Sequence, residues 1–370
     1  MKNVLIFFGG RSQEHDVSVI TGVFTLNALD KTKFTGIPVY VDKDGAFFTG
    51  ESLRDVRNFR LKKPNDLKRV TLLPGDDALY LVGRKLKRLF TAYAAINCMH
   101  GRNGEDGTLS AVLRLSRIAV ASPDVFSSAM AMDKDLTKKC LKASDVPTVD
   151  GVTIIRGDFV DEPDHTVLRV MKLGFPVIIK PANSGSSIGV RVAKDEKTLR
   201  SALVDAFRYD VKVLAEKFLV GAKDVNCACY RLNKRLFVSE CERPVGSEFL
   251  TFSDKYLGVK NGENREFPAN LDGETAARIK EITGKVYDEF GFSGIVRIDY
   301  LVKGGEVFLN EINSVPGSLA YYLFCDKISA FTDLLTDLLA ESVRKNREVE
   351  NCKFTFSSSV LDLKGISLKK

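Results

Sequence analysis

The sequence predicts an α/β fold, in which an open α/β domain is followed by two smaller units that mix helices and strands. The chain has 370 residues, more than the roughly 250–300 at which a single core usually stops growing. Short apolar runs alternate with helix-like segments over the first 125 residues, as they do in sheets with parallel strands. Strand-like segments dominate beyond residue 213.

The first domain, residues 1–125, is predicted from a buried strand and the helix after it. Residues 4–8 are a short apolar run closed by two glycines, which is typical of a buried parallel strand. Apolar residues then recur at helical spacing over residues 17–26. Further strands are expected at 37–41, 94–99 and 118–121, and a helix at 108–115. Ligands of such a sheet gather at the carboxyl ends of its strands, where Gly9 and His100 fall.

The rest of the chain is divided into a central unit at 126–215, a C-terminal unit at 216–345 and a tail at 346–370. In the central unit we expect helices at 132–143, 164–172 and 196–207, and strands at 152–155, 176–180 and 188–192. Towards the C-terminus we expect strands at 213–218, 225–230, 236–241, 294–302 and 306–312, and helices at 272–290 and 331–344.

Composition excludes several classes of protein. The net charge is +7, and the densest basic cluster, at 84–90, is interleaved with apolar residues, so a solvated helix face is favoured over a nucleic-acid patch. No apolar run approaches the ~20 residues that span a bilayer, and the start lacks the apolar core of a signal peptide. Seven scattered cysteines favour reduced thiols over a zinc site or disulfides. We therefore expect a cytoplasmic protein.

The segment 180–189 (KPANSGSSIG) follows an expected strand and has the composition of a phosphate-binding loop. Small residues let backbone amides approach phosphate oxygens, and Lys180 supplies a compact charge. Because this lysine precedes the glycines, the segment is not a Walker A loop. A Ser/Gly hairpin turn is the alternative.

Two neighbouring strands are expected to present a set of metal ligands. Residues two apart in a strand share a face, so Arg297 and Asp299 point to the same side. Glu311 and Asn313 do so on the next strand, which a turn at 304–305 would pair with the first. Carboxylate and amide oxygens without His or Cys suit Mg²⁺ that is held jointly with substrate phosphates. A salt-bridged surface sheet is the alternative.

Three further segments carry polar groups at the ends of expected strands. Residues 9–18 (GGRSQEHDVS) lead into a helix N-terminus, which attracts anions, while Glu14 indicates that an ammonium group is also held. Residues 100–107 (HGRNGEDG) are a polar loop, for which a plain turn is the alternative. Residues 314–317 (SVPG) would leave a backbone N–H for a developing oxyanion.

Together these segments resemble the D-alanine–D-alanine ligases of the ATP-grasp superfamily. The resemblance runs from residue 4 to about residue 340 and rests on six ordered motifs, at 9–18, 100–108, 132–134 (MDK), 180–189, 297–299 (RID) and 310–317. It implies the ATP-grasp fold, with ATP between the central and C-terminal domains. It also implies ATP- and Mg²⁺-dependent ligation of two D-alanines for peptidoglycan synthesis.

The resemblance further implies an ATP site. Lys134 and Lys180 would grip the phosphates beneath a loop that carries Ser186 and Ser187. Asp224 would meet the ribose hydroxyls, with a shorter reach than the family's usual Glu. The hinge strand that reads adenine and the closing loop would add Glu216, Lys217, Phe218, Leu219 and Lys255. Two Mg²⁺ or Mn²⁺ ions would be held by Asp299, Glu311 and Asn313, with Glu311 bridging them.

In such ligases the first D-alanine carboxylate attacks the γ-phosphate to give an acylphosphate, and the amine of the second D-alanine then displaces phosphate. Glu14 would anchor the first ammonium, and Arg297 and the Gly317 amide would stabilise the oxyanion. Tyr256, on a loop that resembles the family's closing loop (254–256, DKY), would bond to Ser186 and Glu14 and exclude water. The other first-site residues implied are Val17, Ser18 and His100.

One position departs from the family pattern. Many members read Pro-Gly-x-Thr-x-x-Ser, and the serine holds the acceptor carboxylate. Residues 316–323 read PGSLAYYL, which puts Tyr322 at the serine position. A tyrosine hydroxyl can donate to a carboxylate, but from several ångströms farther out. We therefore expect that Tyr322 or Ser318 takes over, or that the acceptor differs from D-alanine.

The partners expected are ATP and D-alanine, without nucleic acid or membrane, and a homodimer is compatible with the family. One alternative is a related ligase with another acceptor, such as D-serine. A non-catalytic nucleotide-binding homologue is another, although it would have no need of the full set of lysines and metal ligands. Relatives that form a D-lactate ester have a histidine in the closing loop, and none follows His165 here, so an amide product is favoured.

Overall fold

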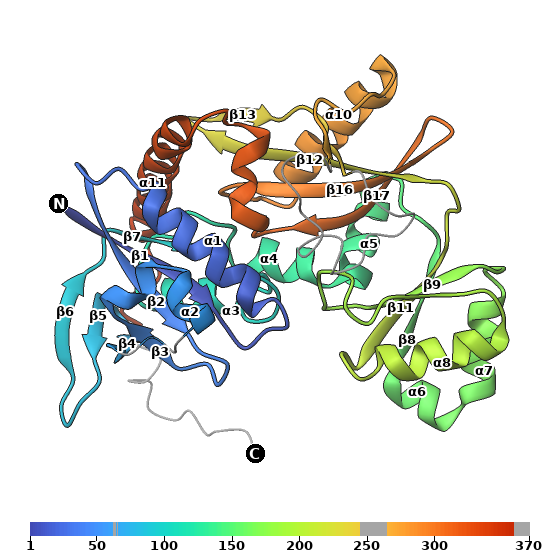
Figure 1. Ribbon diagram of the computed structural model, residues 1–370, viewed down its shortest axis with the longest axis horizontal. Coiled ribbons are helices and arrows are strands. Elements are labelled where there is room, and N and C mark those ends of the chain that lie inside the picture. Colours follow the sequence, from blue (N-terminus) through green and yellow to red (C-terminus); the bar gives the residue numbers. More distant parts are fainter. Residues whose placement is uncertain (62–63, 65, 245–264, 359–370) are drawn as a thin grey trace.

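Three main sheets and the helices around them make up the computed structural model (Figure 1), which describes residues 1–61, 64, 66–244 and 265–358. In Figure 1 the first sheet lies on the left, the second on the right and the third at the top. Within the described ranges, no helix combines the length and apolarity that crossing a membrane requires.

The first sheet has seven strands in the order β6-β5-β4-β3-β2-β1-β7. These strands are β1 Lys2–Gly9, β2 Phe34–Val41, β3 Phe47–Thr49, β4 Lys68–Leu73, β5 Asp76–Leu81, β6 Lys87–Thr91 and β7 Ala94–Asn97. The central strand β1 pairs in parallel with both β2 and β7, whereas the strands from β3 to β6 extend the sheet in antiparallel fashion. Two short helices, η1 Glu51–Arg54 and α2 Arg57–Leu61, lie between β3 and β4.

Residues 4–8 of β1 are fully buried because helices cover both faces of the strand. Val4, Ile6 and Phe8 point to the face that is packed by α1 His15–Ala28 and α11 Ile328–Glu350. Leu5 and Phe7 point to the other face, which is packed by α3 Thr108–Leu115. Successive side chains of a strand point to opposite faces, which explains why these residues divide between the two faces of the sheet. It also explains why the segment reads as a continuous apolar run.

The second sheet is antiparallel, with the order β10-β9-β11-β8. Its strands are β8 Gly151–Ile155, β9 Val177–Pro181, β10 Arg191–Ala193 and β11 Lys212–Lys217. The helices α6 Arg156–Asp161, α7 Pro163–Met171 and α8 Glu196–Ala206 accompany it, and an apolar cluster joins α7, α8 and the strands. The chain enters this unit through α4 Val125–Met132 and α5 Lys134–Ala143.

The third sheet is also antiparallel, with the order β13-β12-β16-β17. Its strands are β12 Lys223–Leu232, β13 Arg235–Val238, β16 Val296–Lys303 and β17 Glu306–Asn313. The helix α10 Gly273–Glu289 packs on it through Ile279, Ile282 and Val286. A small pair, β14 Arg243–Pro244 and β15 Arg265–Glu266, precedes α10. The turn η2 Gly317–Leu323 leads into α11, which joins the first and third sheets in one apolar cluster.

Most elements expected from the sequence are present, and three expectations are wrong. Residues 118–121 form no strand, because only Val120 bridges to Ala95. The helix expected at 132–143 is present as α5, which begins at Lys134 because the extended backbone and carboxylate of Asp133 cap it. The strand expected at 188–192 starts later, as β10. The basic cluster at 84–90 is no helix face, since β6 pairs with β5 there.

The expected strand at 213–218 belongs to the second sheet, as β11, because it pairs with β8 and β9. The division between 215 and 216 stays a prediction, and it falls inside this strand.

Candidate active site

The carboxyl end of β1 is held by a small set of backbone contacts. The Ser18 hydroxyl accepts from the Gly9 N–H at 2.8 Å and donates to the Cys98 carbonyl at 2.8 Å. Gly9 has φ +91°, and a Cβ there would lie 2.3 Å from the Val41 carbonyl oxygen, so the position requires glycine. These contacts fix the start of α1 against β1 and β7. Ser18 thus has a structural task, and its contact with substrate stays a prediction, as does that of the buried Val17.

Glu14 lies just before α1 and is buried. Its carboxylate accepts a hydrogen bond from the Ser186 hydroxyl. Glu14 lies in a loop of the first sheet, whereas Ser186 lies in a loop of the second. The loop packs closely, because a Cβ on Gly185 would lie 2.6 Å from Glu14 Oε2. Ser186 and Ser187 have φ of 51° and 57°, a region that non-glycine residues rarely adopt. The segment 180–189 therefore reaches across to the first domain, as the closing of an active site requires.

His100 takes part in a chain of contacts from the first domain to the segment after β17. Its Nε2 lies 2.8 Å from Thr21 Oγ1, which accepts from the Ser318 N–H at 3.1 Å. Burial lowers the pKa of His100 to about 4, so the imidazole is neutral at pH 7. A neutral ring can donate from one nitrogen and accept at the other.

Glu105 makes a second link between the same two regions. Its carboxylate accepts from the Gly101 N–H at 2.7 Å and from the Val315 N–H at 3.3 Å. Withdrawal of this carboxyl from water, with the nearby charge of Glu14, raises its pKa to about 8. The site thus holds a carboxylic acid beside the ionisable groups that the sequence singled out.

Lys134 and Lys180 both reach towards the strand that carries the predicted metal ligands. Lys134 Nζ donates to the Ser184 carbonyl at 2.6 Å and lies 3.8 Å from Glu311 Oε2. Lys180 Nζ donates to Asn310 Oδ1 at 2.9 Å. Two cations from the central unit therefore meet the edge of the third sheet, where phosphate groups would need them.

The expected pairing of the two ligand strands is confirmed. Asp299 lies opposite Glu311, and Arg297 lies opposite Asn313. Arg297 forms two hydrogen bonds with Asp299, at 2.7 and 2.8 Å. Asn313 Nδ2 also donates to Asp299, at 3.0 Å. Two facing carboxylates, one amide and one guanidinium therefore share one face of β16 and β17.

This donor set fits a magnesium ion that is shared with a substrate. Within the described ranges, no three His, Cys, Asp or Glu side chains come together as a metal cluster, so the protein would supply only part of a coordination shell. Mg²⁺ prefers oxygen ligands and is usually bound by one or two carboxylates together with phosphates and water. Asp299 and Glu311, opposite each other, meet that requirement.

Tyr322 lies against the same arginine. Its hydroxyl accepts from Arg297 Nη1 at 3.4 Å, and the Arg265 guanidinium lies 5.1 Å from its ring centroid. Burial raises the pKa of Tyr322, so the phenol stays protonated. It sits in η2, where three consecutive non-glycine residues, 318–320, have φ between 48° and 52°. Gly317 opens this turn with free space beside it.

The predicted adenine hinge, residues 216–219, includes the end of β11 and the two residues after it. Phe218 donates its N–H to the Pro176 carbonyl at 3.0 Å, and Leu219 comes next. Lys217 is exposed and lies 3.4 Å from Asp150, and Asp224 lies near the start of β12. Glu216 is buried between Lys138 and Lys180. Lys255 and Tyr256 lie outside the described residues.

Three residues near the site were not singled out from the sequence. Glu105 lies inside the motif at 100–107, so its loop was identified but its own role was not. Thr21 lies one helical turn after Val17, and this spacing was the only feature of the sequence that could have indicated it. Lys138 likewise follows Lys134 by one turn of α5, and that spacing places both on one helix face.

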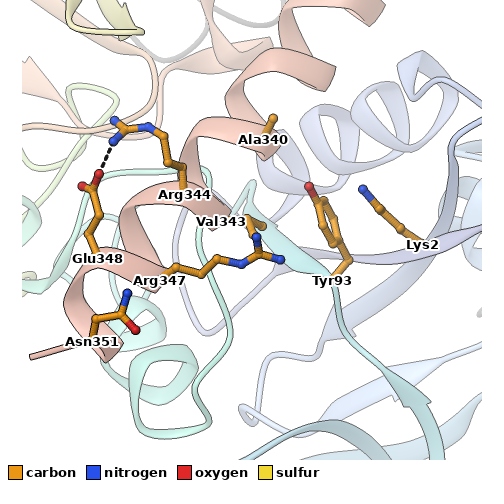
Figure 2. Close-up of a pocket in the computed structure, with 8 residues that line it drawn as sticks. All are labelled: Lys2, Tyr93, Ala340, Val343, Arg344, Arg347, Glu348 and Asn351. Carbon is orange, nitrogen blue, oxygen red and sulfur yellow. Dashed lines mark hydrogen bonds and ion pairs between the residues drawn. The ribbon is translucent and has the colours of Figure 1, made fainter.

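A surface hollow of about 480 Å³ lies away from this site (Figure 2). Lys2 and Tyr93 line it on one side, and Arg344 and Arg347 of α11 on the other. Lys2 is at the amino end of β1, whereas the site is built at the carboxyl end beyond Gly9. The hollow is therefore not part of the candidate active site.

Comparison with protein families matches nearly the whole chain. The family described as D-ala D-ala ligase N-terminus matches residues 3–123, and the one described as D-ala D-ala ligase C-terminus matches residues 140–340. The chain belongs to the D-alanine–D-alanine ligase family. The resemblance drawn from the six motifs is thereby confirmed, and with it the ATP-grasp fold.

Curated members of the family are similar over almost their full length. The D-alanine–D-alanine ligase of Thermosipho melanesiensis is 34% identical over 345 residues, which covers 92% of this chain and 93% of that protein. That of Helicobacter pylori (strain ATCC 700392 / 26695) is 35% identical over 352 residues, with 93% and 95% covered.

Solved structures of the family superpose on this chain. The crystal structure of the D-alanine–D-alanine ligase from Helicobacter pylori has a TM-score of 0.75 at 30% identity, covering 92% of this chain and 98% of that one. The D-Ala:D-Ser ligase from Enterococcus faecalis has a TM-score of 0.73 at 24% identity, covering 93% and 99%. The second likeness shows the fold alone.

Proposed function

We propose that this family member is an ATP-dependent ligase that joins two D-alanines to D-alanyl-D-alanine for peptidoglycan synthesis, with divalent metal ions. One observation carries the proposal. A buried carboxylate that suits an ammonium group, Glu14, is bonded to the loop that also meets the phosphate lysine Lys134, and this lysine lies 3.8 Å from Glu311. An amino-acid site and a phosphate site therefore adjoin. The names of the relatives support the same activity.

ATP would lie between the second and third sheets. Lys134 and Lys180 would bind its phosphates, because both ammonium groups already point to the edge of β17. Ser186 and Ser187 would cover them, and Lys255 would join from the closing loop. The adenine and ribose would be bound by Glu216, Lys217, Phe218, Leu219 and Asp224.

Asp299, Glu311 and Asn313 would hold Mg²⁺ or Mn²⁺. A bound pair of ions would neutralise the charge of the transferring phosphoryl group. Arg297 would act in the next step, and the contacts of its guanidinium with Asp299 and Tyr322 support this role. With the Gly317 N–H, it would stabilise the oxyanion formed when the second amine attacks the acylphosphate.

The first D-alanine would be anchored by its ammonium group on Glu14, with His100, Val17 and Ser18 around it. His100 is neutral and held by Thr21, so it would donate a hydrogen bond without adding charge. Tyr256 would complete the closure over Ser186 and Glu14. Keeping water out matters here, because an acylphosphate otherwise hydrolyses.

The acceptor carboxylate would be held by Tyr322 or Ser318, which share the turn η2. Tyr322 favours a second candidate function as well, since it occupies the family's usual serine position. In that alternative the chemistry is the same and the acceptor is another small D-amino acid, such as D-serine. Product analysis with mixed amino acids distinguishes the two.

We further propose a cytoplasmic enzyme that acts as a homodimer, because the substrates and product are soluble metabolites and many members of the family dimerise. The proposed domains are 1–125, 126–215 and 216–345, followed by a tail at 346–370. A non-catalytic role is disfavoured, since both lysines reach β17 and Arg297 lies on the strand paired with it.

The direct test is phosphate release from ATP with and without D-alanine, followed by mass analysis of the product. We expect release that depends on D-alanine and a product with the mass of the dipeptide. Hydrolysis of ATP that ignores D-alanine, or no turnover with any D-amino acid, would contradict the proposal.

A further inference from the structure

Glu216 is the most enclosed carboxylate of the candidate ATP site. Its side chain is 2% exposed, and each carboxylate oxygen meets a different lysine. Oε2 lies 2.6 Å from Lys180 Nζ, and Oε1 is paired with Lys138. Burial by itself would raise the pKa of Glu216, but the two lysines together hold it below the ordinary value. The carboxylate is therefore kept ionised inside the protein.

The two lysines differ in their other partners. Lys180 also donates to Asn310 on β17, and in the proposed function its charge is shared with the phosphates of ATP. Among the described residues, Lys138 also donates a hydrogen bond to the Val149 carbonyl, at 2.8 Å, and its side chain is 12% exposed. Once a nucleotide engages Lys180, Lys138 becomes the cation that stays with Glu216.

The charge of Glu216 decides what its oxygens can recognise. An ionised carboxylate only accepts hydrogen bonds, whereas a protonated one also donates. A buried carboxyl that loses its counter-charge takes up a proton instead. Adenine carries an amino group at position 6, which donates, and guanine carries an oxygen there, which accepts. An ionised Glu216 would therefore favour adenine and repel guanine.

We propose that Lys138 is a positioning residue for nucleotide choice: by keeping Glu216 an acceptor-only carboxylate, it makes the site select adenine over guanine. The inference rests on the proposed function, because it takes the strand end beside Glu216 as the place where the base binds. Two further charged groups face this pair, namely Lys180 from β9 and Asp150 before β8.

The test compares binding of ADP and GDP by calorimetry, in the presence of Mg²⁺, for the wild type and Lys138→Met. A hydrogen bond to a charged group is worth about ten- to a hundredfold in affinity, so we expect the preference for ADP over GDP to fall by that factor. Lys138→Arg should retain the preference, because it keeps the charge.

Lys139→Met is the matched control. Lys139 lies on the same helix and pairs with Asp135 at 2.8 Å, but its side chain is 69% exposed. The same substitution there removes a lysine–carboxylate pair without touching Glu216, so the nucleotide preference should not change.

A double substitution separates a role through Glu216 from a merely structural one. If Lys138 acts through Glu216, Lys138→Met should change the preference in the wild type and have little further effect in Glu216→Gln. An unchanged preference in Lys138→Met, or equal losses for ADP and GDP, would overturn the inference. Lys138→Gln gives the same comparison if the methionine variant does not fold.

Failure of the proposed function is seen separately. The wild type is assayed for ligation of D-alanine in parallel with nucleotide binding. If the wild type prefers ADP but does not ligate D-alanine, the proposed reaction is rejected. The comparison of ADP and GDP binding would still test the role of Lys138 in nucleotide choice. A wild type without any preference for ADP would reject the inference, even if it ligates.

Discussion

Replacing Tyr322 by phenylalanine tests the position where this chain leaves the family pattern. The Tyr322 hydroxyl accepts from Arg297 at 3.4 Å, and its own proton has no acceptor among the described residues. A phenol that accepts a hydrogen bond from a cation becomes a stronger donor. We therefore expect this proton to be donated to the carboxylate of the acceptor amino acid.

The size of the effect follows from the bond that is lost. A hydrogen bond to a charged group contributes roughly 1.5–3 kcal/mol, and each 1.4 kcal/mol is about tenfold in a binding constant. Tyr322→Phe should raise the acceptor KM by about ten- to a hundredfold. The ring would keep its contact with Arg265, so the loss is confined to the hydroxyl. The KM of the first D-alanine and of ATP should barely move, because Glu14 and the lysines are untouched.

The assay is phosphate release at varied D-alanine with saturating ATP, from which the two D-alanine sites are separated. Ser318→Ala is the comparison, because Ser318 shares the turn η2 and its backbone, not its side chain, bonds to Thr21. If the acceptor KM stays the same in Tyr322→Phe and rises in Ser318→Ala, Ser318 holds the carboxylate and the reasoning about Tyr322 is wrong.

Three further predictions address other parts of the site. Glu311→Gln should abolish ligation while the melting temperature stays close to that of the wild type, because one charge shared by both ions is lost; normal phosphate release would reject the metal assignment. Tyr256→Phe should keep the affinity for ATP but release more phosphate per dipeptide, since water would enter; unchanged coupling would mean that the hydroxyl does not seal the site. Glu105 has a pKa of about 8 in the folded protein against an ordinary 4.5, so the folded state holds an extra proton between these values and stability should fall as the pH rises through them. Glu105→Gln should flatten this decline in urea unfolding, and an unaltered slope would show that another group causes it.

Local patterns in the sequence were sufficient for the elements that form the ligand strands. Alternation placed Arg297 with Asp299 and Glu311 with Asn313, and a two-glycine turn paired the strands, as the structure has them. The buried run at 4–8 likewise predicted β1. In these segments every residue contributes to one period, so local and tertiary preferences agree.

Contacts between distant segments could not be predicted in the same way. The pair of Lys138 with Glu216 joins a helix to a strand 78 positions later, and Glu105 reaches Val315 across 210 positions. Neither has a periodic signal. The strand β6 was missed because its basic residues lie at an exposed sheet edge, where polarity does not distinguish a strand from a helix. Only the hydrogen-bonded pairing with β5 shows that this segment is a strand.

The most direct test of the reaction is the fate of the oxygen atoms of D-alanine. D-Alanine labelled with ¹⁸O in its carboxylate is incubated with ATP, Mg²⁺ and the protein, and the released phosphate is analysed by mass spectrometry. Attack of the carboxylate on the γ-phosphate, followed by displacement at the carbonyl, predicts that the phosphate carries one ¹⁸O atom for each dipeptide formed. Unlabelled phosphate would mean that water attacks ATP, which would contradict ligation through an acylphosphate at this site.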